Sequence, residues 1–321
     1  MGLSVAAAAL LLLEVGARLL LPAVPDPAAQ QPQEDAMEPS AELGWMPRPG
    51  ESRAFGIPGK TWINVNRTRN PEFVEPQPGE LRLLTLGDST VYGVLVNDRE
   101  VFSSIAAQKL QRQLNTTVTA INGGVPGYSS EQARRLLTGS LADVPFDVLV
   151  VATQWSDSQP ADSSDAWRFS RLGAASHAVL YGSGLYRLMD RLLVGPRDAE
   201  VVQWELHDEP GSRRVPLRAY RKNLHAFADI ARKRGAEPVY LLLPSDRDLR
   251  SEPLEAPRPA YREAMREAAE AEGALLIDGI APFVGGDRSL LLDDVHPSRG
   301  GHRLLGETLA AALAPMLSKQ E

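Results

Sequence analysis

The chain has 321 residues, 43% of them hydrophobic, and a formal net charge of −7 at pH 7. This length accommodates one large α/β domain with an extension, and the acidic balance with scattered arginines argues against a nucleic-acid partner. The absence of cysteine excludes disulfides, thiolate metal ligands, a thiol nucleophile and a lipidated cysteine. The five histidines show no metal-ligand spacing, so no metal site is expected.

The first predicted segment, residues 1–24, is apolar and about as long as the roughly 20 residues that span a membrane. Glu14 and Arg18 interrupt it. Each charge costs about 2.5 to 3.5 kcal/mol at the bilayer centre. The two residues are spaced i, i+4, so their charges can partly neutralise each other. A signal peptide usually begins with basic residues, but no basic residue precedes this apolar run. A membrane anchor, a signal peptide and a soluble amphipathic helix all remain open.

Residues 25–78 are predicted to be a Pro-rich, acidic linker followed by an extended lead-in that wraps on the next domain. A linker of this kind favours the anchor or signal interpretation of the preceding segment. Either would place the protein outside the cytoplasm, anchored or exported, whereas the amphipathic helix leaves a cytoplasmic location open.

Residues 79–321 alternate short apolar runs with helical stretches. The expected strands are 81–87, 117–122, 147–153, 238–244 and 274–278. The expected helices are 100–114, 129–140, 218–235, 257–272 and 298–314. Continuous apolar strands separated by helices predict a parallel five-stranded sheet covered on both faces, a three-layer α/β/α sandwich. Functional residues are then expected at the carboxyl ends of the strands.

One segment, about residues 155–216, interrupts this alternation after the third strand, and its part 177–193 is predicted to be helical. An insertion of this length beside the strand ends fits a lid or substrate-selecting subdomain. A peripheral elaboration fits equally well.

Three groups of residues carry possible chemistry. Ser89 follows Gly87-Asp88 at the end of the first strand, the run N-G-G-V-P-G-Y-S supplies Gly124 and Gly127 after the second, and Asp293 lies three residues before His296. A serine at a strand-to-helix turn, glycines with free N–H groups and an Asp-x-x-His loop are the parts of a nucleophilic acyl-transfer site. The structural alternatives are a helix N-cap for Ser89 and tight turns for the glycines.

These motifs together resemble the SGNH, or GDSL, hydrolase family, from about Arg82 to the end of the last helix. The pieces INVNRTRNPEF and DREVFSSIAAQKL, with the apolar start, resemble a bacterial subgroup that is often membrane-tethered or exported. The resemblance implies a flavodoxin-like fold that needs no metal or organic cofactor. It also implies a nucleophile and first oxyanion donor at Ser89, a second donor at Gly127 or Gly124, and triad partners Asp293 and His296.

The third family motif departs from its usual form. The family has Gly-x-Asn-Asp, whose asparagine donates to the oxyanion, and this chain has Gln154-Trp155-Ser156-Asp157. Loss of one oxyanion donor typically costs ~10² to 10³ in turnover, and a serine hydroxyl reaches less far than an asparagine amide. Ser156 is therefore expected to act as a partial donor.

The function that the resemblance implies is a serine ester hydrolase acting on a small-molecule or glycan ester. One alternative is an O-acyltransferase that resolves the same acyl-enzyme with a sugar or polysaccharide hydroxyl. Another is a binding protein on this fold with weakened catalysis, for which the altered third motif is the main argument.

Overall fold

A computed structural model describes residues 13–16, 36–40, 42–53, 55–58, 60–70, 72, 75–161, 164–170 and 213–318. Most of the apolar segment 1–24 and the predicted helix at 177–193 lie outside these residues. No helix among those described is both long enough and apolar enough to span a membrane.

Five parallel strands form the central sheet, in the order β6-β5-β7-β8-β9. They are β5 (Leu81–Gly87), β6 (Val118–Gly124), β7 (Val148–Ala152), β8 (Glu237–Leu242) and β9 (Leu275–Asp278). Every residue of β7 is buried, as expected for a strand covered on both faces. The predicted α/β fold with a five-stranded parallel sheet is confirmed.

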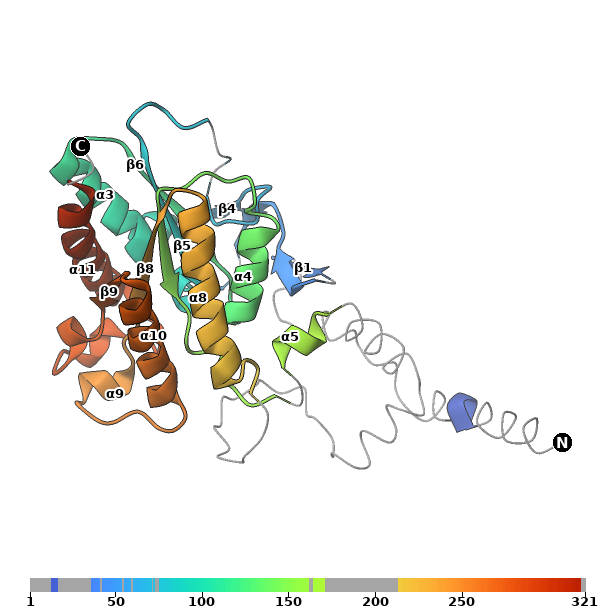
Figure 1. The fold of residues 1–321 in the computed structure, drawn as a ribbon. Helices are drawn as coiled ribbons and strands as arrows, with labels where there is room; N and C mark the ends of the chain where they lie inside the picture. The colour runs from blue at the N-terminus through green and yellow to red at the C-terminus, as the bar shows by residue number, and fades with distance from the viewer. Residues whose placement is uncertain are drawn as a thin grey trace.

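Helices cover both faces of this sheet (Figure 1). One face is covered by two helices that pack on each other, α3 (Phe102–Leu114) and α11 (Arg299–Leu317). The other face is covered by α4 (Ser130–Thr138), α8 (Leu217–Lys233) and α10 (Arg258–Glu272). Alternate residues of a strand point to opposite faces. Leu83 accordingly belongs to the core on the α3 side, and Leu84 and Leu86 belong to the core on the α4 side.

The predicted element boundaries differ from the structure by a few residues. β6 continues to Gly124 because Gly123 and Gly124, interpreted from sequence as turn residues, pair with Leu86 and Gly87. α11 continues through Pro315 to Leu317. The shorter elements were not predicted: α2 (Ser89–Tyr92), α5 (Asp165–Arg168), α9 (Asp246–Leu249), and 3₁₀ turns at Asp98–Glu100, Ala281–Phe283 and Arg288–Leu290.

The strand order places the carboxyl ends of β5 and β7 side by side. The chain runs from β5 to β6 on one side, then crosses back to β7 on the other side of β5. Gly87 is in register with Ala152, so the loops that follow these two residues leave the sheet at one point. Such a topological switch point is where open α/β sheets bind ligands.

The lead-in forms two short antiparallel hairpins. β1 (Met37–Ser40) pairs with β2 (Gly44–Pro47), and β3 (Gly50–Ser52) pairs with β4 (Thr61–Ile63). Extended chain was expected here. Gly44 has a positive φ where β2 begins, and Phe55 and Gly56 have a positive φ in the connection between β3 and β4.

The end of the lead-in covers the edge of β6. The Asn70 side chain donates to Ala120 O at 2.8 Å and accepts from Asn122 N at 2.7 Å. The buried Arg69 guanidinium donates to Tyr92 O, Gly93 O and Val96 O at 2.5 to 2.7 Å. Backbone groups of an otherwise open edge strand are thereby satisfied.

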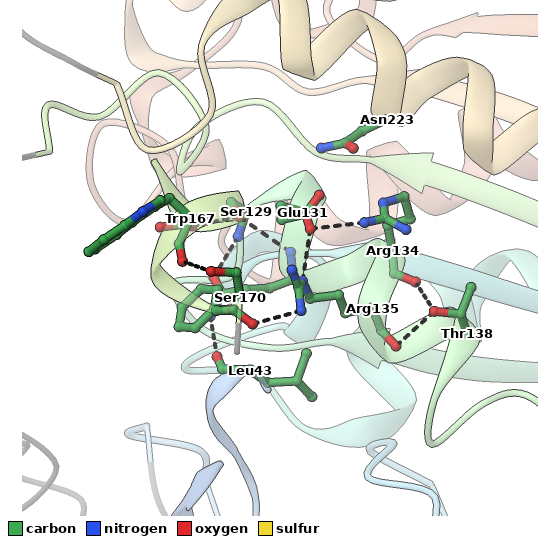
Figure 2. A network of polar contacts seen from close by, with 12 residues as sticks. Leu43, Ser129, Glu131, Arg134, Arg135, Thr138, Trp167, Ser170 and Asn223 are labelled. Atoms are coloured by element: carbon green, nitrogen blue, oxygen red, sulfur yellow. Dashed lines mark hydrogen bonds and ion pairs between the residues drawn. The ribbon is translucent and has the colours of Figure 1, made fainter. Parts of the chain in front are cut away.

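The N-terminal half of α4 joins three segments of the chain (Figure 2). Ser129 caps the helix in a capping box with Gln132. The Gln132 amide donates to Leu43 O at 2.6 Å, in the lead-in, and Arg135 donates to Phe169 O at 2.9 Å, just after α5. Glu131 accepts from Arg135 at 2.8 Å and so orients this guanidinium.

The described ends of the insertion meet each other. Pro160 and Arg213 form an isolated antiparallel bridge, Arg214 N donates to Gln159 O at 2.9 Å, and Val215 N donates to Asp157 O at 3.1 Å. The described residues on the two sides of the insertion are therefore joined by backbone hydrogen bonds.

Candidate active site

Ser89 lies directly after β5, as the first residue of α2. Asp88 is the N-cap of this helix, and its Oδ1 accepts from Thr90 N at 3.0 Å. The structural alternative for Ser89, a cap, is thus a role that Asp88 fills. The Ser89 hydroxyl remains available for a different partner.

That partner is His296, 207 residues later in the chain. Ser89 Oγ lies 2.7 Å from His296 Nε2, and His296 Nδ1 lies 2.6 Å from Asp293 Oδ2. The other carboxylate oxygen, Asp293 Oδ1, accepts from Val295 N and His296 N, both at 2.9 Å. The structure thus brings Ser89, His296 and Asp293 into one hydrogen-bonded chain.

The charges in this chain favour a protonated imidazole. Partial burial acts to raise the pKa of Asp293, but the His296 hydrogen bond and charge and two backbone N–H groups outweigh it and lower the pKa to about 2. Burial acts to lower the pKa of His296, and the Asp293 hydrogen bond and charge, with the charge of Asp88, raise it above its ordinary value. An imidazole in this setting can receive a proton from Ser89.

The two glycines of the second motif have different surroundings. The Gly124 N–H donates to Asn122 Oδ1 at 3.0 Å, and a Cβ at Gly124 would lie 2.3 Å from Tyr92 N, so this glycine permits close packing. Gly127 has φ +78°, and its N–H meets no acceptor among the described residues. Gly127 is therefore the glycine that retains a hydrogen-bond donor.

Residues of the altered third motif are all buried. Gln154 donates from Nε2 to Leu243 O at 3.2 Å, and the Trp155 ring packs under Arg258 and Arg262, whose guanidinium carbons lie 5.4 and 5.3 Å from its centroid. The backbone of Ser156 acts to lower the pKa of the Asp88 carboxyl, against the larger effect of burial. The Ser156 hydroxyl has no hydrogen-bond partner in the part of the chain that the structure describes.

Asp157 ties the same loop to α4. Its Oδ1 accepts from Ser130 N at 2.9 Å, while its Oδ2 is buried without a described hydrogen-bond partner. Burial raises the pKa of Asp157 to about 7, against the hydrogen bonds from Ser130 and the charge of Arg214. This carboxylate holds the loop to the first turn of α4.

Two residues that the sequence analysis did not single out hold the Gly127 loop. Trp45 donates from Nε1 to Pro126 O at 3.0 Å, and Arg214 donates from Nη1 to Gly127 O at 2.7 Å. Both contacts join residues more than 80 positions apart. No local spacing or periodicity in the sequence signals them.

The sequence profile of the GDSL-like lipase/acylhydrolase family matches residues 85–304. This range includes Ser89, Gly127, Ser156, Asp293 and His296, but not the lead-in. None of the curated proteins compared with this chain matches it in sequence.

Solved structures similar to this chain include three hydrolases. An α/β hydrolase from the Lake Arreo metagenome is 17% identical, with a TM-score of 0.48 over 72% of this chain and 94% of its own. A lipase/acylhydrolase from Enterococcus faecalis is 16% identical, with a TM-score of 0.47 over 74% and 96%. An acetylxylan esterase from Geobacillus stearothermophilus is 16% identical, with a TM-score of 0.48 over 73% and 94%.

The profile covers more than half of the chain, and the motifs it spans occur on the sheet and in the order described above. The chain therefore belongs to the GDSL-like lipase/acylhydrolase family.

Proposed function

We propose that this protein is a serine ester hydrolase in which Ser89 is the nucleophile, His296 the general base and Asp293 the residue that orients the imidazole. The observation that carries the proposal is the continuous hydrogen-bonded chain from Ser89 Oγ through His296 to Asp293, at 2.7 and 2.6 Å. Nucleophile, base and orienting carboxylate within hydrogen-bond reach are the requirement for this chemistry.

In the proposed reaction, His296 Nε2 removes the Ser89 proton while Oγ attacks the ester carbonyl carbon. The tetrahedral intermediate collapses when its C–O bond to the alcohol breaks, and His296 returns the proton to the leaving alkoxide. Water, deprotonated by His296, then attacks the acyl-enzyme, releasing the acid and restoring the Ser89 hydroxyl. Asp293 stabilises the imidazolium that forms in both halves of the reaction.

The proposed oxyanion donors are the backbone N–H groups of Ser89 and Gly127 and the hydroxyl of Ser156. Ser89 N lies at the first position of α2, where no intrahelical acceptor exists. The availability of the Gly127 N–H and of the Ser156 hydroxyl supports their assignment. The substrate class that we propose is a small-molecule or glycan ester.

The test of the nucleophile is covalent labelling with a fluorophosphonate probe. Wild-type protein and Ser104→Ala, a half-buried serine on α3 away from the site, should both label, and Ser89→Ala should not. Absence of labelling in folded wild-type protein would refute the proposal and favour a non-catalytic binding protein. Products formed with and without a sugar acceptor then distinguish hydrolysis from acyl transfer.

The role of Ser156 is tested by steady-state kinetics on a p-nitrophenyl ester. Ser156→Ala removes the side-chain donor and should lower kcat, by less than the ~10² to 10³ that a strong oxyanion donor supplies, because the hydroxyl is short. Ser158→Ala is the matched control, since its Oγ is bonded to Trp155 O at 3.2 Å. An unchanged kcat in Ser156→Ala would show that Ser156 is not a donor.

A further inference from the structure

We propose that Trp45, in the lead-in outside the family match, is a positioning residue that fixes the orientation of the Gly127 N–H. The inference rests on the proposed function, because it concerns one of the oxyanion donors assigned there. Trp45 lies on β2, and residues 85–304 are the matched range.

Trp45 contacts the peptide unit that carries the Gly127 N–H. Trp45 Nε1 donates to Pro126 O at 3.0 Å, and this oxygen belongs to the same planar unit as the N–H of Gly127. The Pro126–Gly127 bond is trans, so its C=O and N–H point in opposite directions. An indole that fixes the oxygen on one side therefore fixes the direction of the N–H on the other.

The peptide on the other side of Gly127 is held as well. Arg214 Nη1 donates to Gly127 O at 2.7 Å. Arg214 is itself anchored, because Nη2 donates to Asp165 Oδ2 at 2.8 Å and to Gln132 Oε1 at 2.6 Å. Rotation of the Gly127 backbone would have to break one of these contacts.

The loop is also tied to the nucleophile turn. Val125 N donates to Gly87 O at 3.1 Å, two residues before Ser89. A Gly127 N–H with a fixed direction is thus fixed relative to Ser89, which is what preorganised oxyanion stabilisation requires.

Trp45 has little freedom to follow a displaced loop. Its ring meets the Tyr128 ring edge to face at 5.7 Å, and the Tyr128 hydroxyl donates to Trp45 O. A Cβ at Gly127 would lie only 3.1 Å from Trp45 Cζ2, so the ring packs directly on this glycine. The indole therefore has two roles that can be separated: its ring packs on Gly127 and Tyr128, and its N–H positions the Pro126–Gly127 peptide.

The experiment separates these roles with Trp45→Phe, which retains an aromatic ring and removes the donor. Trp62→Phe is the matched control, because Trp62 is exposed on the neighbouring hairpin. In Trp45→Phe we expect kcat on a p-nitrophenyl ester to fall on the order of ten-fold, since small displacements of catalytic groups have large effects on rate. KM, the pH midpoint of kcat/KM and fluorophosphonate labelling of Ser89 should be retained.

A second variant guards against loss of packing in Trp45→Phe. Replacement of Trp45 by β-benzothienylalanine exchanges the indole N–H for sulfur at nearly constant volume, and the same fall in kcat is required. Wild-type kcat in this variant, or a change confined to KM, would overturn the inference while leaving the proposed function intact. Failure of wild-type protein to label or turn over would instead overturn the proposed function itself.

Discussion

The Ser89 hydroxyl, the proposed nucleophile, is not needed as a helix cap, because a neighbouring residue takes that structural role. Asp88 caps α2 through its bond to Thr90 N, and it is almost fully buried, which raises its pKa. The Ser156 backbone acts to lower the pKa of the Asp88 carboxyl, so this buried acid interacts both with the turn after β5 and with the loop after β7. The two strand ends that define the site are thereby held together at the level of single residues.

The pH dependence of activity follows from His296. In the proposed reaction the neutral imidazole is the base, and its pKa lies above the ordinary value of 6.5. As pH falls through this pKa the imidazole becomes protonated, so kcat/KM should fall on the acid side with a midpoint above 6.5. Initial rates on an ester from pH 5 to 9 measure the midpoint.

Asp293→Asn should change both the midpoint and the rate. Removing the carboxylate removes the hydrogen bond and charge that raise the His296 pKa, so the acid midpoint should move down. Turnover should fall by roughly 10² to 10⁴, as expected when the orienting group of a triad is lost. Asp294→Asn is the control, because the Asp294 side chain is exposed and the carbonyl of Asp294 accepts from Asp246 N. A midpoint moved by Asp294→Asn alone would contradict the assignment of Asp293.

Among the elements, β6 depends on the lead-in for the satisfaction of its open edge. Only one of its sides pairs with another strand of the sheet, β5. On the other side, Asn70 meets Ala120 O and Asn122 N, and Arg69 N donates to Asn122 O at 3.0 Å. Arg69 and Asn70 thus act in place of a further strand, and they support the strand whose end carries Gly124 and the Gly127 loop.

Asn70→Ala tests this support. The substitution leaves Ala120 O and Asn122 N without their partner, and each partly buried group left unpaired costs about 1 to 3 kcal/mol. The free energy of unfolding in urea should fall by about 2 to 4 kcal/mol, allowing for some access of water. Gln113→Ala, exposed on α3, should change it by less than about 0.5 kcal/mol. Equal transition midpoints for the two variants would show that the lead-in does not support β6.

For the whole molecule, the sequence was most informative where patterns are local. The apolar runs of β5, β7 and β8 and the amphipathic helices between them could be placed because their periodicity is set by burial of whole elements. The meeting of Ser89, Asp293 and His296 was expected from the resemblance to the family, which assigns all three to one site. The structure places His296 within hydrogen-bond distance of both Ser89 and Asp293, and the catalytic roles of the three residues stay a proposal.

What could not be predicted depends on single contacts between distant residues. The hairpin of Trp45 carries no alternating apolar pattern, so its pairing and its contact with Pro126 had no sequence signal. The sequence did not distinguish Gly124 from Gly127 as the proposed oxyanion donor. The difference is that the Gly124 N–H donates to the Asn122 side chain, a contact that depends on side-chain geometry. Gln132 precedes the insertion in the sequence and Arg214 follows it. The hydrogen bond between them therefore had no local signal in the sequence either.

The bridge between Pro160 and Arg213 also has a consequence for protein engineering. Asp165 anchors Arg214 and Phe169 contacts α4, so the part of the insertion that can be exchanged without loss of these contacts is the cassette 171–212. The entropic cost of closing a loop between two fixed ends grows only slowly with its length, so cassettes of different lengths are compatible with the same sheet. Substrate preference could then be altered by exchanging this cassette while the strand that presents Ser89 and the loop that presents His296 keep their sequence.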